Sequence, residues 1–148
     1  MKVSEILRVK GNTLYTATPE QPLAAAIALM AELDVGSLVV MESGRMAGML
    51  TFREVLKALK DGGNCPAEAK VGDVMVRDPV TAYPEMEANE LRQLMIDKHS
   101  RYLPVLEGPL LMGVISFLDV AKAVLEEQRF ENQMLKNYIK NWPEETQA

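Results

Sequence analysis

The sequence Gly113-Val114-Ile115-Ser116-Phe117-Leu118-Asp119 has an earlier counterpart in Gly48-Met49-Leu50-Thr51-Phe52-Arg53-Glu54. In each copy an apolar run that begins at a glycine ends at a hydroxyl residue, and a carboxylate follows three residues later. This spacing is typical of a capping box at the N-terminus of a helix. The same groups can bind a nucleotide, because helix N–H groups suit a phosphate and an ionised carboxylate accepts from ribose hydroxyls. The glycine lets either a ligand or a backbone approach closely. By itself the pattern favours the helix cap, which is its common use.

The two motifs belong to a longer internal repeat. When the chain is shifted by 65 residues, 14 positions between residues 16 and 58 are identical, where about three are expected by chance. A second internal similarity, at an offset of 68, aligns residues 3–7 with residues 71–75. Single units of roughly 60 to 70 residues are marginally stable. The sequence therefore predicts two homologous units, each of which completes the other.

The composition excludes several classes of protein. The chain has 148 residues, 16 Lys and Arg against 21 Asp and Glu, and a net charge of −5, whereas nucleic-acid binding relies on clustered cations. Its single Cys excludes an intramolecular disulfide and a cysteine-cluster zinc site. No apolar run reaches the roughly 18 residues of a membrane-spanning helix, and the first residues lack the apolar core of a signal peptide. We expect a cytoplasmic protein with no nucleic-acid and no membrane partner.

Within each unit the pattern alternates between helix and strand. A helix pattern follows each Thr-Pro-Glu or Tyr-Pro-Glu turn, two short apolar strands come next, and a closing helix begins at Phe52 or Phe117. An extra strand is expected at residues 13–16 or 79–81. The predicted boundaries are 1–60 for the first repeat, 61–70 for a linker, 71–125 for the second repeat and 126–148 for a C-terminal helical extension.

These features resemble a tandem pair of CBS domains, named after cystathionine β-synthase. The resemblance rests on the doubled motif above and on the strands before it, Ser37–Val40 and Tyr102–Val105, and it extends to a tail like that of stand-alone bacterial CBS-pair proteins. It implies an α/β (α+β) fold of two β-α-β-β-α repeats packed around a pseudo-twofold axis. It also implies a homodimer and an adenine nucleotide, such as AMP, ADP, ATP or NAD, in the clefts between repeats.

The resemblance assigns roles in the second repeat. Asp119 would hold ribose hydroxyls, Ser116 would face phosphate, and Arg101 matches a basic position where the family often has an anion contact. The adenine would be walled by Pro79, Val80, Thr81, Pro104 and Val105.

The first repeat departs from the family pattern. Glu54 replaces the motif aspartate and is one methylene longer, which displaces its carboxylate. Thr51 and Arg53 still match. The resemblance therefore implies a second, weaker or differently shaped site at Thr51, Arg53 and Glu54.

Two other residues have ordinary explanations. His99 is the only histidine, so no multi-histidine metal site exists, and we expect it to end a helix at the surface. Cys65 lies in the linker far along the chain from any candidate base, so we expect a passive thiol rather than a nucleophile. No metal and no catalytic cofactor are predicted.

The tail from Asp119 onward contains no Gly or Pro before Pro143, which predicts one long helix. Its second half carries an apolar stripe that needs a surface to bury against, and a partner subunit suits it best. The stripe comprises Phe130, Met134, Leu135, Tyr138, Ile139 and Trp142.

Three functions are open at this point. The preferred hypothesis is a sensor that binds an adenine nucleotide between repeats and signals to an unknown regulated protein through a change in packing. The alternative is a ligand-free interaction module that acts through its dimer surface. An enzyme is disfavoured, because the sequence offers no base and nucleophile pair and no metal cluster.

Overall fold

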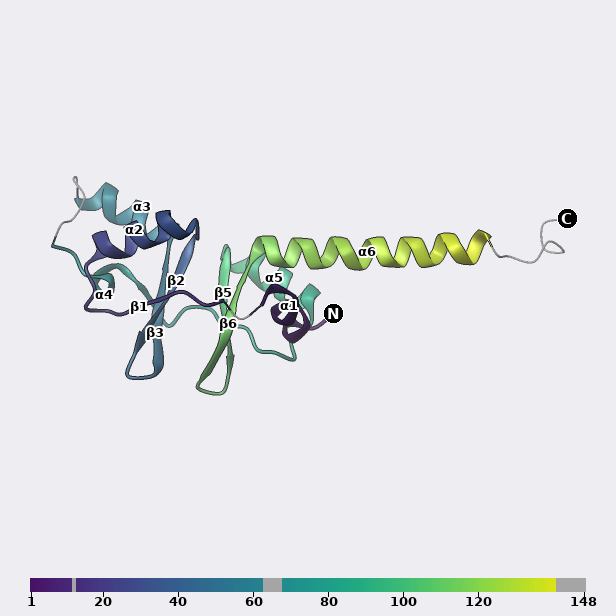
Figure 1. Cartoon of the computed structure of the whole chain (residues 1–148), viewed down its shortest axis with the longest axis horizontal. Coiled ribbons are helices and arrows are strands. Elements are labelled where there is room, and N and C mark those ends of the chain that lie inside the picture. The colour runs from purple at the N-terminus through teal and green to yellow at the C-terminus, as the bar shows by residue number, and fades with distance from the viewer. Residues whose placement is uncertain (12, 63–67, 141–148) are drawn as a thin grey trace, which may run out of the picture.

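The computed structural model describes residues 1–11, 13–62 and 68–140. Two similar α/β halves lie side by side, with their sheets toward each other, and one long helix projects from the second half (Figure 1). The helices are α1 (Val3–Lys10), α2 (Leu23–Leu33), α3 (Phe52–Gly62), α4 (Val71–Val74), α5 (Ala88–Lys98) and α6 (Phe117–Lys140). The strands are β1 (Thr16–Ala17), β2 (Ser37–Glu42), β3 (Arg45–Thr51), β4 (Val76–Arg77), β5 (Tyr102–Glu107) and β6 (Leu110–Ser116). The expected α/β fold with two repeats is confirmed.

The central hairpin of each half has the same register. The strands β2 and β3 pair antiparallel with an irregularity between Val40 and Met41, and β5 and β6 pair with one between Val105 and Leu106, 65 positions later. Three consecutive residues in the middle of β2 and of β5 are buried. Each hairpin therefore contributes its central rows to a core.

The first long helix of each half is also equivalent. Both α2 and α5 have 11 residues, and both end at a residue in the left-handed conformation, Asp34 with φ 54° and His99 with φ 54°. Their buried residues correspond at the offset of 65, and they are Leu23, Ala26 and Met30 in α2 and Ala88, Leu91 and Met95 in α5. The duplication read from the sequence therefore extends to helix length, cap and buried face, and the expected helix end at His99 is confirmed.

The two halves exchange their short N-terminal helices. Val3 and Ile6 of α1 are buried in the core of the second half, whereas Val71 of α4 is buried in the core of the first. Backbone bonds fix each helix, from Val3 N–H to the Met86 carbonyl at 2.8 Å and from Val71 N–H to the Gln21 carbonyl at 2.9 Å. Neither core is complete without a segment that belongs to the other repeat in sequence.

The fourth strand of the first sheet depends on Gly48. The backbone of β4 pairs with β3 at Gly48, and a Cβ at Gly48 would overlap the Val76 carbonyl oxygen. The close approach that this motif glycine permits is therefore that of a backbone. The extra strand predicted at 79–81 is not formed; the pairing occurs instead at β4 and at the isolated bridge between Ala82 and Val105.

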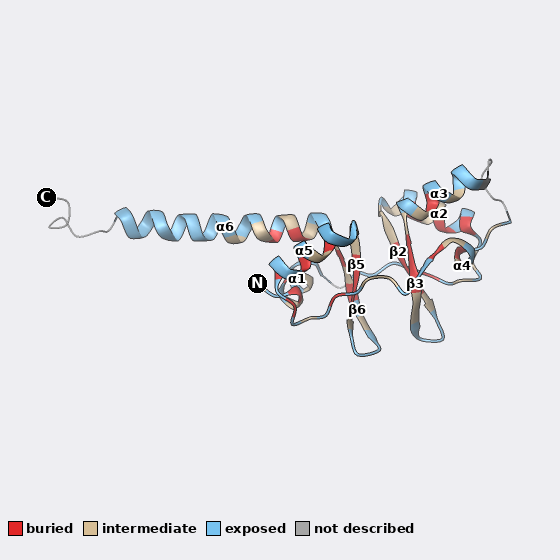
Figure 2. Cartoon of the chain, turned by 180° about the vertical axis from the view of Figure 1, so that it is seen from behind, coloured by how far each residue is buried: buried red, intermediate tan, exposed pale blue. Residues whose placement is uncertain are grey.

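Helix α6 is a single helix of 24 residues, as predicted, and is about 36 Å long at about 1.5 Å per residue. Its buried residues are Val120 and Ala123, near its start. The rest projects beyond the domain, and residues 128–140 are exposed (Figure 2). Trp142 of the expected apolar stripe lies outside the described residues, as does Cys65 of the expected linker.

Candidate functional site

The motif of the second repeat forms a reciprocal helix cap. The Ser116 N–H donates to Asp119 Oδ2 at 2.9 Å, and the Asp119 N–H donates to Ser116 Oγ at 3.1 Å. This is the capping box that the spacing favours by itself.

The motif of the first repeat caps its helix differently. Both the Thr51 N–H and the Thr51 hydroxyl donate to Glu54 Oε1, at 2.8 and 2.7 Å, and the Arg53 N–H donates to Thr51 Oγ1 at 3.3 Å. The longer side chain of glutamate allows its carboxylate to fold back onto the cap residue. Glu54 therefore stays close to Thr51.

The two helix N-termini offer fewer free donors than the sequence suggests. The Phe52 N–H donates to the Gly36 carbonyl at 3.1 Å, and the Phe117 N–H donates to the Arg101 carbonyl at 2.8 Å. Together with the caps, these bonds engage two of the first three N–H groups of α3 and of α6. An anion at either helix must therefore rely mainly on side chains.

The Asp119 carboxylate has an internal cation. Lys10, the last residue of α1, places its Nζ 2.7 Å from Asp119 Oδ2 and also donates to the Val114 carbonyl at 2.7 Å. Burial raises the pKa of Asp119, but the hydrogen bond from Lys10 and those from Ser116 outweigh it, so the pKa lies below its usual range. The exchanged helix thus supplies a charge to the residue expected to hold ribose.

Two cavities lie where the repeats meet, and each takes residues from both repeats. The smaller, of about 450 Å³, is called the Ser116 cavity, and the larger, of about 850 Å³, is called the Thr51 cavity. Both volumes fall in the range of small-molecule sites. The Ser116 cavity is lined by Lys10, Thr13, Leu14, Tyr15, Asp34, Val35, Gly36, Ser37, Arg101, Tyr102, Val114, Ser116, Phe117 and Leu118. The Thr51 cavity is lined by Met49, Thr51, Phe52, Arg53, Glu54, Leu56, Val76, Asp78, Pro79, Val80, Met95, Ile96, His99, Ser100, Arg101, Tyr102, Leu103 and Phe117.

The cavities are related by the repeat. Apart from Lys10 and the shared Arg101 and Tyr102, every described residue of the Ser116 cavity has its counterpart at an offset of 65 in the Thr51 cavity. Each cavity takes its capped helix from one repeat and the segment before the first long helix from the other. The pseudo-twofold relation therefore holds at the candidate sites.

This crossover separates residues that the sequence placed together. Pro79 and Val80 line the Thr51 cavity rather than joining Ser116. Thr81, Pro104 and Val105 line neither cavity, because Ala82 pairs with β5 and Val105 is buried in the core. Asp119 is likewise not among the described residues that line either cavity. The two cavities therefore divide these residues between them, and the residues that contact a ligand stay a prediction.

Arg101, Tyr102 and Phe117 line both cavities. They form the wall between the cavities, and a Cβ at Gly36 would overlap the Tyr102 ring from the other repeat. The Arg101 side chain makes no hydrogen bond or ion pair with another residue in the described part of the chain. Its guanidinium is available to an anion on either side.

The electrostatic character of the two cavities differs. The residues that line the Thr51 cavity include two arginines, Arg53 and Arg101, and the Arg53 side chain likewise has no partner among the described residues. In the Ser116 cavity Leu118 occupies the position equivalent to Arg53, and Lys10 is already paired. Guanidinium groups bind phosphate through paired N–H donors, and the Thr51 cavity sets its two arginines beside two carboxylates, Glu54 and Asp78.

Several lining residues were not predicted from the sequence. They include Lys10, residues 13–15 and residues 34–37 in the Ser116 cavity. The repeat offered one signal, because Leu14 and Tyr15 align with Pro79 and Val80. It could not indicate Lys10, which has no charged equivalent at the offset of 65.

Comparison with known proteins identifies the family. The CBS domain family model matches residues 3–61 and 71–126. The chain is a tandem CBS-domain protein. The CBS domain-containing protein CBSX3, mitochondrial, of Arabidopsis thaliana is 32% identical over 146 residues, covering 93% of this chain and 71% of CBSX3.

Solved structures share the CBS fold. The CBS-domain containing protein ATU1752 from Agrobacterium tumefaciens is 27% identical with a TM-score of 0.79, covering 83% of this chain and 98% of that one. The CBS domain pair of protein MJ0100, at 17% identity and a TM-score of 0.75, covers 86% of this chain and 98% of the pair. The MJ0100 pair was solved in complex with 5-methylthioadenosine and S-adenosyl-L-methionine.

Two further features are absent from residues 1–11, 13–62 and 68–140. No helix there is long and apolar enough to cross a membrane. No group of three or more His, Cys, Asp or Glu there is placed to hold a metal ion.

Proposed function

We propose that this CBS pair is a regulatory module that binds an adenine nucleotide in the Thr51 cavity and signals through a change in the packing of its repeats. The observation that carries the proposal is a pair of arginines, Arg53 and Arg101, at a cavity of about 850 Å³, whose side chains have no partner among the described residues. Such a pair provides charge-assisted hydrogen bonds to a phosphate.

The rest of the Thr51 cavity suits a nucleoside. Pro79 and Val80 are half-buried and provide an apolar surface for a base, and Glu54 provides carboxylate oxygens for hydroxyl groups. This order of sites is the reverse of the one expected from the sequence, in which Ser116 and Asp119 led. The reversal rests on Lys10, which already neutralises the charge of Asp119, and on the smaller volume of the Ser116 cavity.

A bound ligand can alter packing because each cavity is built from both repeats. Contacts to Arg53 from the first repeat and to Arg101 from the second join the two halves through one molecule. A ligand shifts an equilibrium only through different affinities for the two states, and a cavity between repeats meets that condition when their relative placement changes. The adenosyl ligands of the MJ0100 pair support the choice of ligand class.

Titration calorimetry and thermal unfolding with AMP, ADP, ATP, NAD and S-adenosyl-L-methionine test the proposal. Binding is expected to stabilise the native state by about 2.7 kcal/mol at a hundredfold excess over Kd. Arg53→Leu should weaken binding about tenfold, whereas Arg92→Ala, which removes an exposed α5 charge that lines neither cavity, should leave it unchanged. No heat and no shift with any of these ligands at millimolar concentration would refute the proposal.

The alternative is a ligand-free interaction module, which the exposed apolar side chains of α6 favour. We also propose a homodimer as the working form. A cytoplasmic location and the absence of catalytic activity stay predictions. Measured turnover of any bound nucleotide would contradict the predicted absence of catalytic activity.

A further inference from the structure

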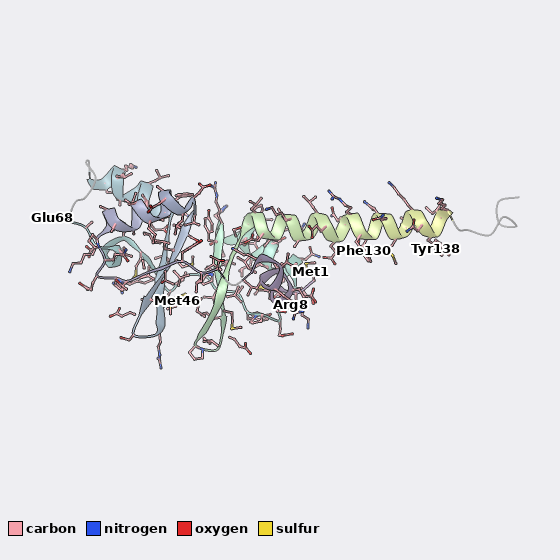
Figure 3. The ribbon with its side chains drawn as sticks, viewed as in Figure 1. Met1, Arg8, Met46, Glu68, Phe130 and Tyr138 are labelled. Atoms are coloured by element: carbon pink, nitrogen blue, oxygen red, sulfur yellow. The ribbon has the colours of Figure 1, made fainter. Side chains whose placement is uncertain are left out.

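One face of α6 continues from the domain core into solvent. Val120, Ala123, Glu127, Phe130 and Met134 are spaced by 3, 4, 3 and 4 residues, which places them on one side of the helix. Val120 and Ala123 are buried, and Glu127 is half-buried with the amino terminus of Met1 3.8 Å from its Oε1. Phe130 and Met134 are 64% and 58% exposed. The face that packs in the core therefore emerges uncovered just past Glu127, and Figure 3 places Phe130 on this projecting part.

The projecting part of α6 has charge of opposite sign in its two halves. Residues 126–131 contain Glu126, Glu127, Arg129 and Glu131, and residues 132–140 contain Lys136 and Lys140. The first segment is therefore acidic overall and the second is basic. A helix with this pattern complements a second copy of itself that runs in the opposite direction.

We infer that α6 pairs antiparallel with α6 of a second copy of this chain. Phe130 and Met134 occupy the two core positions of the heptad repeat. Phe130 therefore packs against Met134 of the second copy, and Met134 packs against Phe130 of the second copy. The same register sets Glu126 opposite Lys140 of the second copy at both ends of the contact. The overlap runs from about residue 124 to residue 140, or about 25 Å of helix.

The charges disfavour a parallel pair. In a parallel coiled coil the position of Glu126 faces that of Glu131 on the other helix, which sets two pairs of like charges together. The antiparallel register forms two Glu126–Lys140 pairs of opposite charge. Its one unfavourable contact is the approach of Glu131 to Glu131 of the second copy. The pattern therefore specifies direction as well as a partner.

Two charge-reversal variants test this pairing in the full-length chain. Glu126→Lys and Lys140→Glu should each weaken the dimer about tenfold in sedimentation equilibrium, because each sets like charges together at both ends. An equimolar mixture of the two variants should dimerise, since a mixed pair restores opposite charges at both ends. Tighter dimers of Glu126→Lys alone would indicate a parallel pair and overturn the inference, as would a wild-type chain that stays monomeric.

A second pair of variants tests the apolar seam. Phe130→Asp should weaken the dimer roughly 30-fold or more, as loss of a central apolar anchor does. Leu125→Asp is the matched control, because Leu125 is similarly exposed, at 61% against 64% for Phe130, and lies on the opposite side of α6. Equal effects of the two variants would overturn the inference. Circular dichroism of each variant verifies that α6 stays helical, and nucleotide titration of Phe130→Asp separates this pairing from the proposed function.

Discussion

The two cavities are built from equivalent residues of a duplicated sequence, yet single positions give them different chemistry. Arg53 in the Thr51 cavity corresponds to Leu118 in the Ser116 cavity, and Glu54 corresponds to Asp119. Glu54 is bonded to Thr51, the residue that precedes its own helix, whereas Asp119 is bonded to Ser116 and also to a lysine of the exchanged helix α1. The repeat therefore supplies the frame of both cavities, and the substitutions between copies decide which one suits an anion.

The largest effect is expected from Arg101, which lines both cavities. Arg101→Ala should lower nucleotide affinity about 10- to 100-fold, because hydrogen bonds to charged groups contribute about 1.5–3 kcal/mol. Titration calorimetry measures the change, with Arg92→Ala as the variant that removes the same charge elsewhere. Retained affinity in Arg101→Ala would show that the shared wall does not bind the anion.

The sequence predicts the features that depend on residues close together in the chain, and it does not predict those that depend on contacts between distant parts of the chain. The capped helices, the hairpins and the equivalence of Ser116 with Thr51 all follow from local spacing and from the offset of 65. The presence of Pro79 and Thr51 in one cavity does not follow from the local spacing. It results from the exchange of α1 and α4 between the two cores, which brings distant parts of the chain into contact.

The sequence also does not predict the contact of Lys10 with Asp119. Its Nζ meets Asp119 across 109 positions of the chain, and the second repeat has no lysine that corresponds to it at either offset. A repeat reveals what two copies share, whereas this contact is a difference between them.

Exchange of one side chain between the cavities gives the next largest effect. Arg53→Leu gives the Thr51 cavity the residue of the Ser116 cavity and should weaken binding about tenfold through loss of one charge-assisted contact. Leu118→Arg makes the reverse change and should create or strengthen binding at the Ser116 cavity, which calorimetry reports as a change in stoichiometry. Arg53→Leu with unchanged affinity would contradict the ranking of the cavities.

The smallest expected effect concerns the Lys10–Asp119 ion pair, which is the feature that sets the Ser116 cavity apart. Because the pKa of Asp119 is lower in the folded protein than in the unfolded chain, this carboxylate stabilises the fold above about pH 4. That stabilisation is lost as the pH falls through the lowered pKa of the folded state. Lys10→Met should cost about 1 kcal/mol of unfolding free energy near pH 7, and its difference from the wild type should shrink with acidification.

Urea unfolding between about pH 3 and pH 7 measures this difference. Lys57→Met serves as the control, since Lys57 is exposed and forms no ion pair among the described residues. The pH dependence should be reduced in Lys10→Met rather than abolished, because the Ser116 N–H still donates to Asp119. A difference between Lys10→Met and the wild type that stays constant down to the lowest pH would mean that Lys10 stabilises the fold through packing of its side-chain stem and not through its charge.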